Sequence, residues 1–430
     1  MAAFYLARAP IQCAMPSTPQ AIHDPYAALR LPNYRLYALG NLLVITSHQM
    51  LIMAVRWDLY AKTGSALVLG MIGFVQILPT LILFLPGGHV ADRFNRKRVT
   101  QLTTCVYMLC SIGMALASYF HASLSGGFLW AFYGLLFLMG VANAFYMPAK
   151  QSMLPYLVPA GVLPNAITWN SSIFQVAAVS GPVLSGFLID RFNCLPIYVM
   201  DACVSLLFLF FLTQIHYQGQ KQEKKGMNWK SLMEGVRFVR KTKPILATLT
   251  MDLFAVLLGG CMALLPIFVK DILHEGAWAM GWLQASPFFG ALLMAFLIAQ
   301  KPLKKPGLTL LWAVAGFGAT VIVFGLSRNL WLSMAMLFIS GALDNISVIV
   351  RATLVQVLTP NRLLGRVQSV NFLFINSSNE LGAFESGVAA ALLGPVPAVV
   401  LGGIASIGIV LLVGKIWPEV SRLKPFRKTA

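Results

Sequence analysis

The stretch GGHVADRFNRKRV, from Gly87 to Val99, decides how the rest of the chain is interpreted. Within it, one acid and four bases lie close together: Asp92, Arg93, Arg96, Lys97 and Arg98. On either side lie about twenty apolar residues with almost no charge. A short charged segment between two long apolar ones is typical of a loop that joins two membrane-spanning helices.

The composition of the whole chain supports this interpretation. The 430 residues are 58% hydrophobic and 11% charged, and the mean hydropathy is +0.75. A soluble protein carries roughly a quarter charged residues, so this chain cannot cover a water-facing surface of its size. We therefore expect a multi-pass protein in a lipid bilayer. The net charge of +18 is attributed to basic loops, and no nucleic acid partner is expected.

Hydropathy predicts twelve membrane-spanning segments. A helix needs about 20 apolar residues to cross the hydrocarbon, and in lipid the backbone must satisfy its own hydrogen bonds. The predicted spans are 36–57, 67–86, 99–119, 128–148, 166–189, 196–215, 245–268, 279–300, 308–326, 331–350, 367–392 and 398–417.

The distribution of Lys and Arg predicts the orientation. Five of the chain's 32 basic residues fall on the side opposite the N-terminus, namely Arg56, Lys62, Arg191, Lys270 and Arg328. Basic loops stay in the cytoplasm, so both termini are predicted to be cytoplasmic, in the inner membrane of a cell.

The longest connection divides the chain into two halves. The expected parts are a cytoplasmic tail (1–33), a six-helix half (34–216), a central loop (217–244), a second six-helix half (245–417) and a basic cytoplasmic tail (418–430). Within the central loop, apolar residues recur at helical spacing between bases from Trp229 to Val239. This pattern predicts an amphipathic helix on the membrane surface; a plain polar linker is the alternative.

An internal repeat relates the two halves. With a shift of 201 residues, GVANAFYMPAKQSMLPYLVP (140–159) aligns with GALDNISVIVRATLVQVLTP (341–360), and Lys150 aligns with Arg351. The same shift aligns Gly181 and Gly186 with Gly382 and Gly387. Such repeats imply a pseudo-two-fold axis along the membrane normal, with a substrate site between the halves near the midplane and transport by rocking.

The segment from Gly88 to Arg98 resembles the loop signature between the second and third helices of the major facilitator superfamily. Asn95 stands where that signature usually has glycine, and Asn also tolerates a left-handed turn. The resemblance implies an all-α membrane protein with twelve transmembrane helices in two pseudo-symmetric six-helix halves. The stretches WDLYAKTGSALVLGMIGFVQILPTLILFLPGG and SSNELGAFESGVAAALLGPVPAVVLGG are similar to the bacterial branch of enterobactin exporters and macrolide-efflux proteins.

The resemblance also implies a gating role for this loop. Its residues are Gly88, Asp92, Arg93, Arg96, Lys97 and Arg98. In the superfamily the aspartate is thought to reach the start of the eleventh helix and to latch the inner face shut. Here that target lies near Gly365 to Val370, and the candidate latch partners are Lys150, Arg351 and Arg366. The alternative is a loop that only sets orientation. The motif DRFN recurs at Asp190–Asn193 on the predicted outer side, which we interpret as coincidence.

Ionisable residues inside predicted spans are candidates for proton coupling, because such residues are costly in lipid and usually line a pathway. The candidates are His48, Asp252, Asp344, Glu380 and Glu385. Exclusion from water favours the neutral form of a carboxyl group, which suits a proton carrier. Each could instead be structural, and Asp344 with Arg351 could form a static ion pair. Glu380 and Glu385 point about 140° apart on a helix, so we do not expect them to form one site.

The fifth predicted span contains GPVLSG, with Gly181, Pro182 and Gly186. It resembles the end of an antiporter signature, although Thr168 and Ala177 replace two upstream glycines. Proline removes a backbone donor and glycines let another helix approach closely. The segment therefore predicts a bent, tightly packed helix and favours proton antiport.

Together these features predict a secondary transporter that exports an amphipathic small molecule, siderophore-like or drug-like, in exchange for protons. We expect a monomer without cofactor or bound metal. No nucleophile or acid–base arrangement predicts an enzyme, and the six cysteines lack metal-ligand spacing. The alternatives are uptake or facilitated diffusion of a small solute, lysolipid flipping, or a membrane protein that does not transport.

Overall fold

The computed structural model describes residues 24–120, 127–217, 229–301, 303 and 305–421. All the elements formed by these residues are helices. The first bundle contains α1 (Pro32–Thr63), α2 (Ala66–Arg93), α3 (Arg96–Tyr119), α5 (Gly127–Met153), α6 (Leu163–Phe192) and α7 (Leu195–Gln214). After α8 (Trp229–Lys241), the second contains α9 (Lys243–Gly259), α10 (Leu265–Ile267), α11 (Ala277–Gln300), α12 (Pro306–Leu326), α13 (Leu330–Leu358), α14 (Asn361–Leu393) and α15 (Pro395–Ile416).

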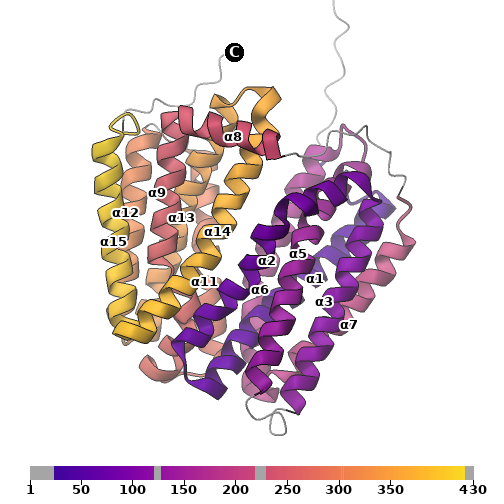
Figure 1. Cartoon of the computed structure of the whole chain (residues 1–430), viewed down its shortest axis with the longest axis horizontal. Coiled ribbons are helices and arrows are strands. Elements are labelled where there is room, and N and C mark those ends of the chain that lie inside the picture. The colour runs from indigo at the N-terminus through magenta and orange to yellow at the C-terminus, as the bar shows by residue number, and fades with distance from the viewer. Residues whose placement is uncertain (1–23, 121–126, 218–228, 302, 304, 422–430) are drawn as a thin grey trace, which may run out of the picture.

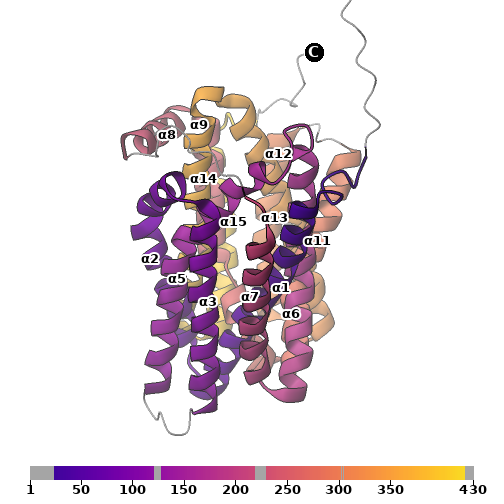
Figure 2. The same ribbon diagram turned by 90° about the vertical axis from the view of Figure 1, so that its right-hand side faces the viewer.

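The two bundles lie side by side, with their long helices roughly parallel (Figures 1 and 2). Among the described residues, eleven spans are long and apolar enough to cross a membrane. The eleventh predicted span, 367–392, lies within α14, which is 33 residues long but is not among those eleven. Arg362, Arg366, Asn376 and Glu380 make α14 less apolar than its neighbours.

The seventh predicted span, 245–268, is not one continuous α-helix. Helix α9 ends at Gly259, a 3-10 turn follows at Met262–Leu264, and the short α10 leads into a π-helical turn at Phe268–Ile272. Irregular backbone at membrane depth is tolerated where protein surrounds it, and Leu264 and Leu265 are both fully buried.

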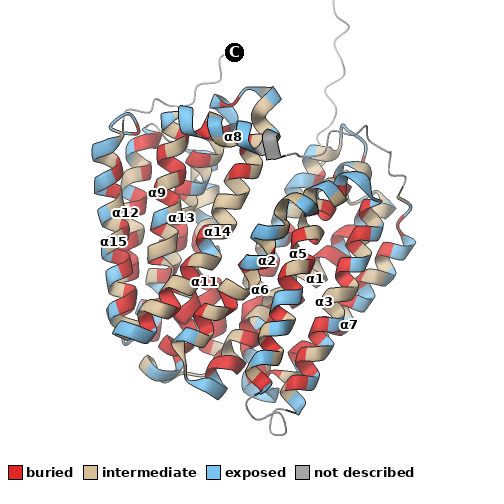
Figure 3. Cartoon of the chain, viewed as in Figure 1, coloured by how far each residue is buried: buried red, intermediate tan, exposed pale blue. Residues whose placement is uncertain are grey.

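Exposed positions lie along the outer faces of both bundles (Figure 3), and many of them carry large apolar side chains. Trp130, Trp312, Trp331, Leu392 and Leu411 are each at least 70% exposed. Contiguous exposure of this kind would be unfavourable in water and is expected where lipid surrounds the protein.

Matching glycine contacts show the pseudo-symmetry of the two bundles. Gly140 of α5 packs against Pro79 of α2, and Gly341 of α13 packs against Pro287 of α11. The α5–α13 pair follows the 201-residue shift of the sequence repeat, whereas the α2–α11 pair follows a shift of 208 residues. The first helices of the halves are therefore related by a slightly longer shift than the later ones.

A second set of contacts crosses between the bundles with the same symmetry. A Cβ at Gly73 of α2 would lie 3.0 Å from the Cβ of Ala383 in α14. A Cβ at Gly281 of α11 would lie 2.5 Å from the carbonyl oxygen of Pro182 in α6. These positions are again related by 208 and 201 residues. Pro182 and its neighbouring glycines thus form part of a close helix contact, as the sequence predicted.

The largest hydrophobic core joins the halves at the end of the molecule opposite α8. It contains Tyr60 and Ile189 from the first half and Phe268, Met280 and Phe324 from the second. At the α8 end each half has a core of its own, and a smaller cluster there joins them, since Phe84 and Leu85 of α2 pack against the cluster that contains Val239 and Val367. The more extensive apolar contact between the halves therefore lies at the end opposite α8.

The predicted amphipathic helix is present as α8. Val236 and Val239 pack with Ile245 of α9 and Val367 of α14. Helix α8 therefore covers one end of the second bundle, next to the start of α14 (Figure 2).

Candidate functional site

A cavity of about 820 Å³ lies within the first bundle and reaches the second. All but two of its lining residues belong to the first half; the exceptions are Asn376 and Glu380 of α14. The sequence repeat predicts a site shared between the halves. The cavity does contact both halves, but the first half supplies almost all of its lining residues.

Amide side chains supply much of the polar wall. These are Gln49 of α1, Gln76 of α2, Asn143 and Gln151 of α5, Asn170 and Gln175 of α6, and Asn376 of α14. Amides both donate and accept hydrogen bonds, so this wall can bind neutral polar groups in several orientations.

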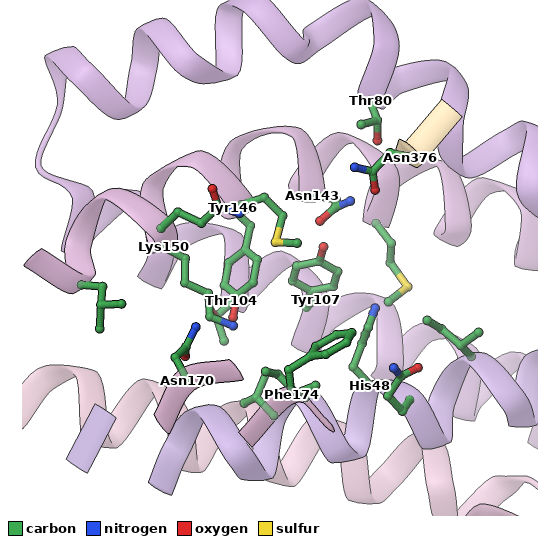
Figure 4. A pocket seen from close by; sticks show the side chains of 18 of the residues that line it. His48, Thr80, Thr104, Tyr107, Asn143, Tyr146, Lys150, Asn170, Phe174 and Asn376 are labelled. Carbon is green, nitrogen blue, oxygen red and sulfur yellow. The ribbon is translucent and has the colours of Figure 1, made fainter. Parts of the chain in front are cut away.

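A row of aromatic rings crosses the cavity (Figure 4). The His48 ring packs edge-on against Tyr107 with 5.4 Å between ring centroids, and Tyr107 packs edge-on against Tyr146 at 5.6 Å. The Lys150 ammonium lies 5.0 Å from the Tyr146 ring centroid. Three helices, α1, α3 and α5, thus present a continuous aromatic surface that ends at a cation.

Two acids line the cavity, and they differ in their surroundings. The two carboxylate oxygens of Asp201 accept hydrogen bonds from the hydroxyls of Ser47 and Ser111, at 2.7 and 2.6 Å. Glu380 is half-buried on α14 and interacts electrostatically with Arg56 of α1. Asp201 is therefore held in place by its own bundle, whereas Glu380 is the acid that the second bundle brings to the cavity.

Of the five proton-coupling candidates, the structure brings His48 and Glu380 to the cavity. Glu385, Asp344 and Asp252 are not part of its wall. Glu380 and Glu385 therefore occupy separate environments, as their helical spacing predicted.

The alternative that Asp344 and Arg351 form a static ion pair is not what the structure shows, because Arg351 forms its ion pair with Asp252. Asp252 also accepts a hydrogen bond of 3.2 Å from Ser347, and Asp344 is a half-buried neighbour that interacts with both charges. Asp252, the partner of Arg351, lies on α9. Spacing along the sequence indicated only Asp344, which lies about two turns before Arg351 on α13, so it could not identify Asp252.

The charged stretch at Gly88–Arg98 joins two helices. Gly88, Asp92 and Arg93 lie in the last turns of α2, and Asn95 caps α3 by accepting a 3.2 Å hydrogen bond from the backbone N–H of Arg98. The bases lie on their own bundle: Arg96 donates to the carbonyls of Ala91 and Ser152, and Lys97 donates to the carbonyls of Thr213 and Ile215.

Asp92 is exposed, and the structure records no ion pair for it among the described residues. Its three candidate partners lie elsewhere: Lys150 lines the cavity, Arg351 pairs with Asp252, and Arg366 pairs with Glu234 of α8. The latch is therefore not formed in this conformation.

The interpretation of the second DRFN motif as coincidence is wrong. The Asp190 carboxylate, at the end of α6, accepts hydrogen bonds from the backbone N–H groups of Ala277 and Trp278, at 2.7 and 3.0 Å. These N–H groups begin α11 in the other bundle and have no partner within their own helix. Nearby, the Tyr60 hydroxyl donates to Asp271. The motif thus closes the end of the molecule opposite α8.

This arrangement defines the chain as a multi-pass membrane transporter of two related bundles, with a cavity that lies in the first bundle and reaches the second. The family model of the Major Facilitator Superfamily matches residues 37–383, and the chain belongs to that family.

Proteins similar to this chain support the assignment. The chain is 27% identical over 357 residues to the uncharacterized MFS-type transporter YfiS of Bacillus subtilis, which covers 79% of this chain and 82% of YfiS. It is 24% identical over 398 residues to the enterobactin exporter EntS of Citrobacter koseri, covering 91% and 94% of the two chains. A bacterial homologue of the iron transporter ferroportin, in its inward-facing state, matches with a TM-score of 0.70 and 16% identity, covering 92% and 99% of the two chains.

Proposed function

We propose that the chain exports an amphipathic small molecule across the bacterial inner membrane in exchange for protons. The cavity carries this proposal, because one wall offers amides and aromatic rings while His48 and Glu380 bring titratable groups to the same space from opposite halves. Substrate and protons can then compete for one site, which is the requirement for exchange.

The proposed orientation places the α8 end in the cytoplasm. The support is the concentration of Lys and Arg at the ends of the spans on that side. With the opposite end closed by Asp190 and Tyr60, this conformation receives substrate from the cytoplasm. A single chain forms the whole cavity, so we propose that the monomer is the transporting unit.

Inverted membrane vesicles test both direction and coupling. The vesicles are energised to an acidic interior, and a pH-sensitive dye reports proton release when siderophores, macrolides or other amphiphiles are added. Export by exchange predicts proton release with at least one compound and none from vesicles that lack the protein. Accumulation of the same compounds by whole cells, without proton release from vesicles, would instead establish uptake.

A further inference from the structure

A buried cation without a paired acid lies in the cavity wall. Lys150 is 9% exposed, and the structure records no ion pair or hydrogen bond for its ammonium group among the described residues. The ammonium group instead makes a cation–π contact with the ring of Tyr146. Burial of a charge is costly unless the charge is paired, so this site lacks a partner of opposite charge.

The second half shows what a paired version of this site looks like. Arg351, which is related to Lys150 by the sequence repeat, is 3% exposed and pairs with Asp252, with Asp344 close by. The two halves thus place a basic residue at the same position, but the second half neutralises it internally.

Pseudo-symmetry identifies the residues that replace those acids in the first half. Helices α1 and α9 follow the 208-residue shift, because Gly181 packs on Gln49 of α1 just as Gly382 packs on Leu257 of α9. The counterpart of Asp252 is therefore Val44, and with the 201-residue shift the counterpart of Asp344 is Asn143. Both Val44 and Asn143 line the cavity, so the space that holds acids in one half is apolar or neutral in the other.

A second unpartnered group lies beside this cation. The Tyr146 hydroxyl is buried and has no hydrogen-bond partner in the part of the chain that the structure describes, although buried hydroxyls nearly always have one. Lys150, Tyr146, Thr104 and Asn170 gather at one end of the cavity (Figure 4). The acids elsewhere in the wall do not fill this gap, since Asp201 is bonded to two serines and Glu380 lies on α14.

From this geometry we infer that Lys150 and the Tyr146 hydroxyl bind an oxyanion of the transported solute, a carboxylate or an ionised phenol, while Tyr107 and His48 hold its aromatic or apolar part. The inference rests on the proposed function, because it names the class of substrate that the transport cavity accepts: amphipathic organic acids. An incoming anion supplies the charge that Asp252 supplies in the second half.

Three fluorescent probes that share one ring system test the inference by binding alone. They are pyrenebutyrate, pyrenebutanol and pyrenebutylamine. Binding to the full chain in lipid nanodiscs is measured at about pH 6, and the signal of empty nanodiscs is subtracted to correct for partition into lipid. The expected order of affinity is acid, then alcohol, then amine. Hydrogen bonds to charged groups are worth about 1.5–3 kcal/mol, and 1.4 kcal/mol is tenfold. Lys150→Met should therefore weaken acid binding at least about tenfold and leave alcohol binding unchanged.

Two further variants separate charge recognition from general damage. Lys150→Arg should keep the preference for the acid. Val44→Asp restores the acid that the second half carries, so it should weaken binding of pyrenebutyrate as much as Lys150→Met does, without weakening binding of pyrenebutanol. Tyr146→Phe should weaken acid binding by a smaller factor.

The inference is overturned if wild type binds the three probes equally or prefers the amine, or if Lys150→Met or Val44→Asp binds the acid as tightly as wild type. Failure of the proposed function looks different. Suppose that the chain binds the acid selectively but no acid causes proton release from vesicles. That result would support the oxyanion site and contradict proton-coupled export. Proton release by neutral compounds, unaffected in Lys150→Met, would keep transport and remove the acid site.

Discussion

Two glutamates five residues apart on α14 have different surroundings, and this difference carries the proposed proton coupling. Glu380 lines the cavity, whereas Glu385 does not. The sequence could list both as candidates, because both lie deep in an apolar span, and their spacing predicted separate environments. The rotation of α14 against the first bundle decides that Glu380 is the one that lines the cavity.

We predict that Glu380→Gln makes transport independent of the proton gradient, because the amide keeps the shape and cannot carry a proton. Glu385→Gln is the matched control and should keep the coupling of wild type. The measurement is the rate of compound-induced proton release over a range of external pH. Equal loss of proton release in both variants, or loss in Glu385→Gln alone, would contradict the assignment of proton coupling to the cavity residue Glu380.

The ion pair of Asp252 and Arg351 is predicted to be structural. Removing one partner leaves the other charge buried and unpaired, which costs about 3–5 kcal/mol, whereas removing both together is often neutral. Arg351→Met should therefore lower the thermal unfolding temperature of the purified protein markedly, and Arg351→Met combined with Asp252→Leu should recover most of the loss. A double variant that is less stable than either single one would contradict this assignment.

Helix ends, rather than helix interiors, control the contact between the halves. Asp190 of α6 caps α11 across the interface in this conformation, and the proposed latch of Asp92 on the start of α14 belongs to the opposite conformation. An acid at the N-terminus of another helix is stabilising in both cases. The two aspartates are therefore proposed to stabilise opposite states.

We predict that Asp190→Ala favours the state that is open opposite α8. Loss of a helix cap costs about 1 kcal/mol, roughly a fivefold shift in population. Spin labels at Phe192 and His274 should report a larger fraction of long distances than in the parent protein. Arg191→Ala, one residue away on the exposed surface, is the control and should leave the distances unchanged. A shift of equal size in this control would contradict the stabilising role of the Asp190 cap.

Asp92→Asn is predicted to act in the opposite direction. Asp92 has no ion pair with any residue that the structure describes, so its loss should leave this conformation intact and weaken the other one. Labels at Gly161 and Gln356, both exposed at the α8 end, should then show a larger fraction of long distances. A larger fraction of short distances would show that Asp92 holds the α8 end open instead.

Sequence reasoning predicted the helices well and the side-chain partners poorly. Apolar length sets where a helix crosses lipid, so each predicted span falls on an observed helix, except where α9 gives way to short turns after Gly259. Helices also continue beyond the apolar segment: α2 ends seven residues and α13 eight residues after the predicted span, and α14 begins six residues before it. Partners depend on how helices rotate and approach. The capping by Asp190, the pairing of Arg351 with Asp252 and the unpaired Lys150 therefore emerged from the structure alone.

Alternating access to the cavity is the central claim for the whole molecule, and side-specific labelling tests it without knowledge of the substrate. Ser171 lines the cavity and is exposed. A single cysteine at Ser171, in a chain without its native cysteines, is treated with a membrane-impermeant sulfonated maleimide in inverted and in right-side-out vesicles.

The account predicts fast labelling from the α8 side, slow labelling from the other side, and faster labelling from that other side in Asp190→Ala. Labelling from the α8 side alone, with no change in Asp190→Ala, would contradict alternating access.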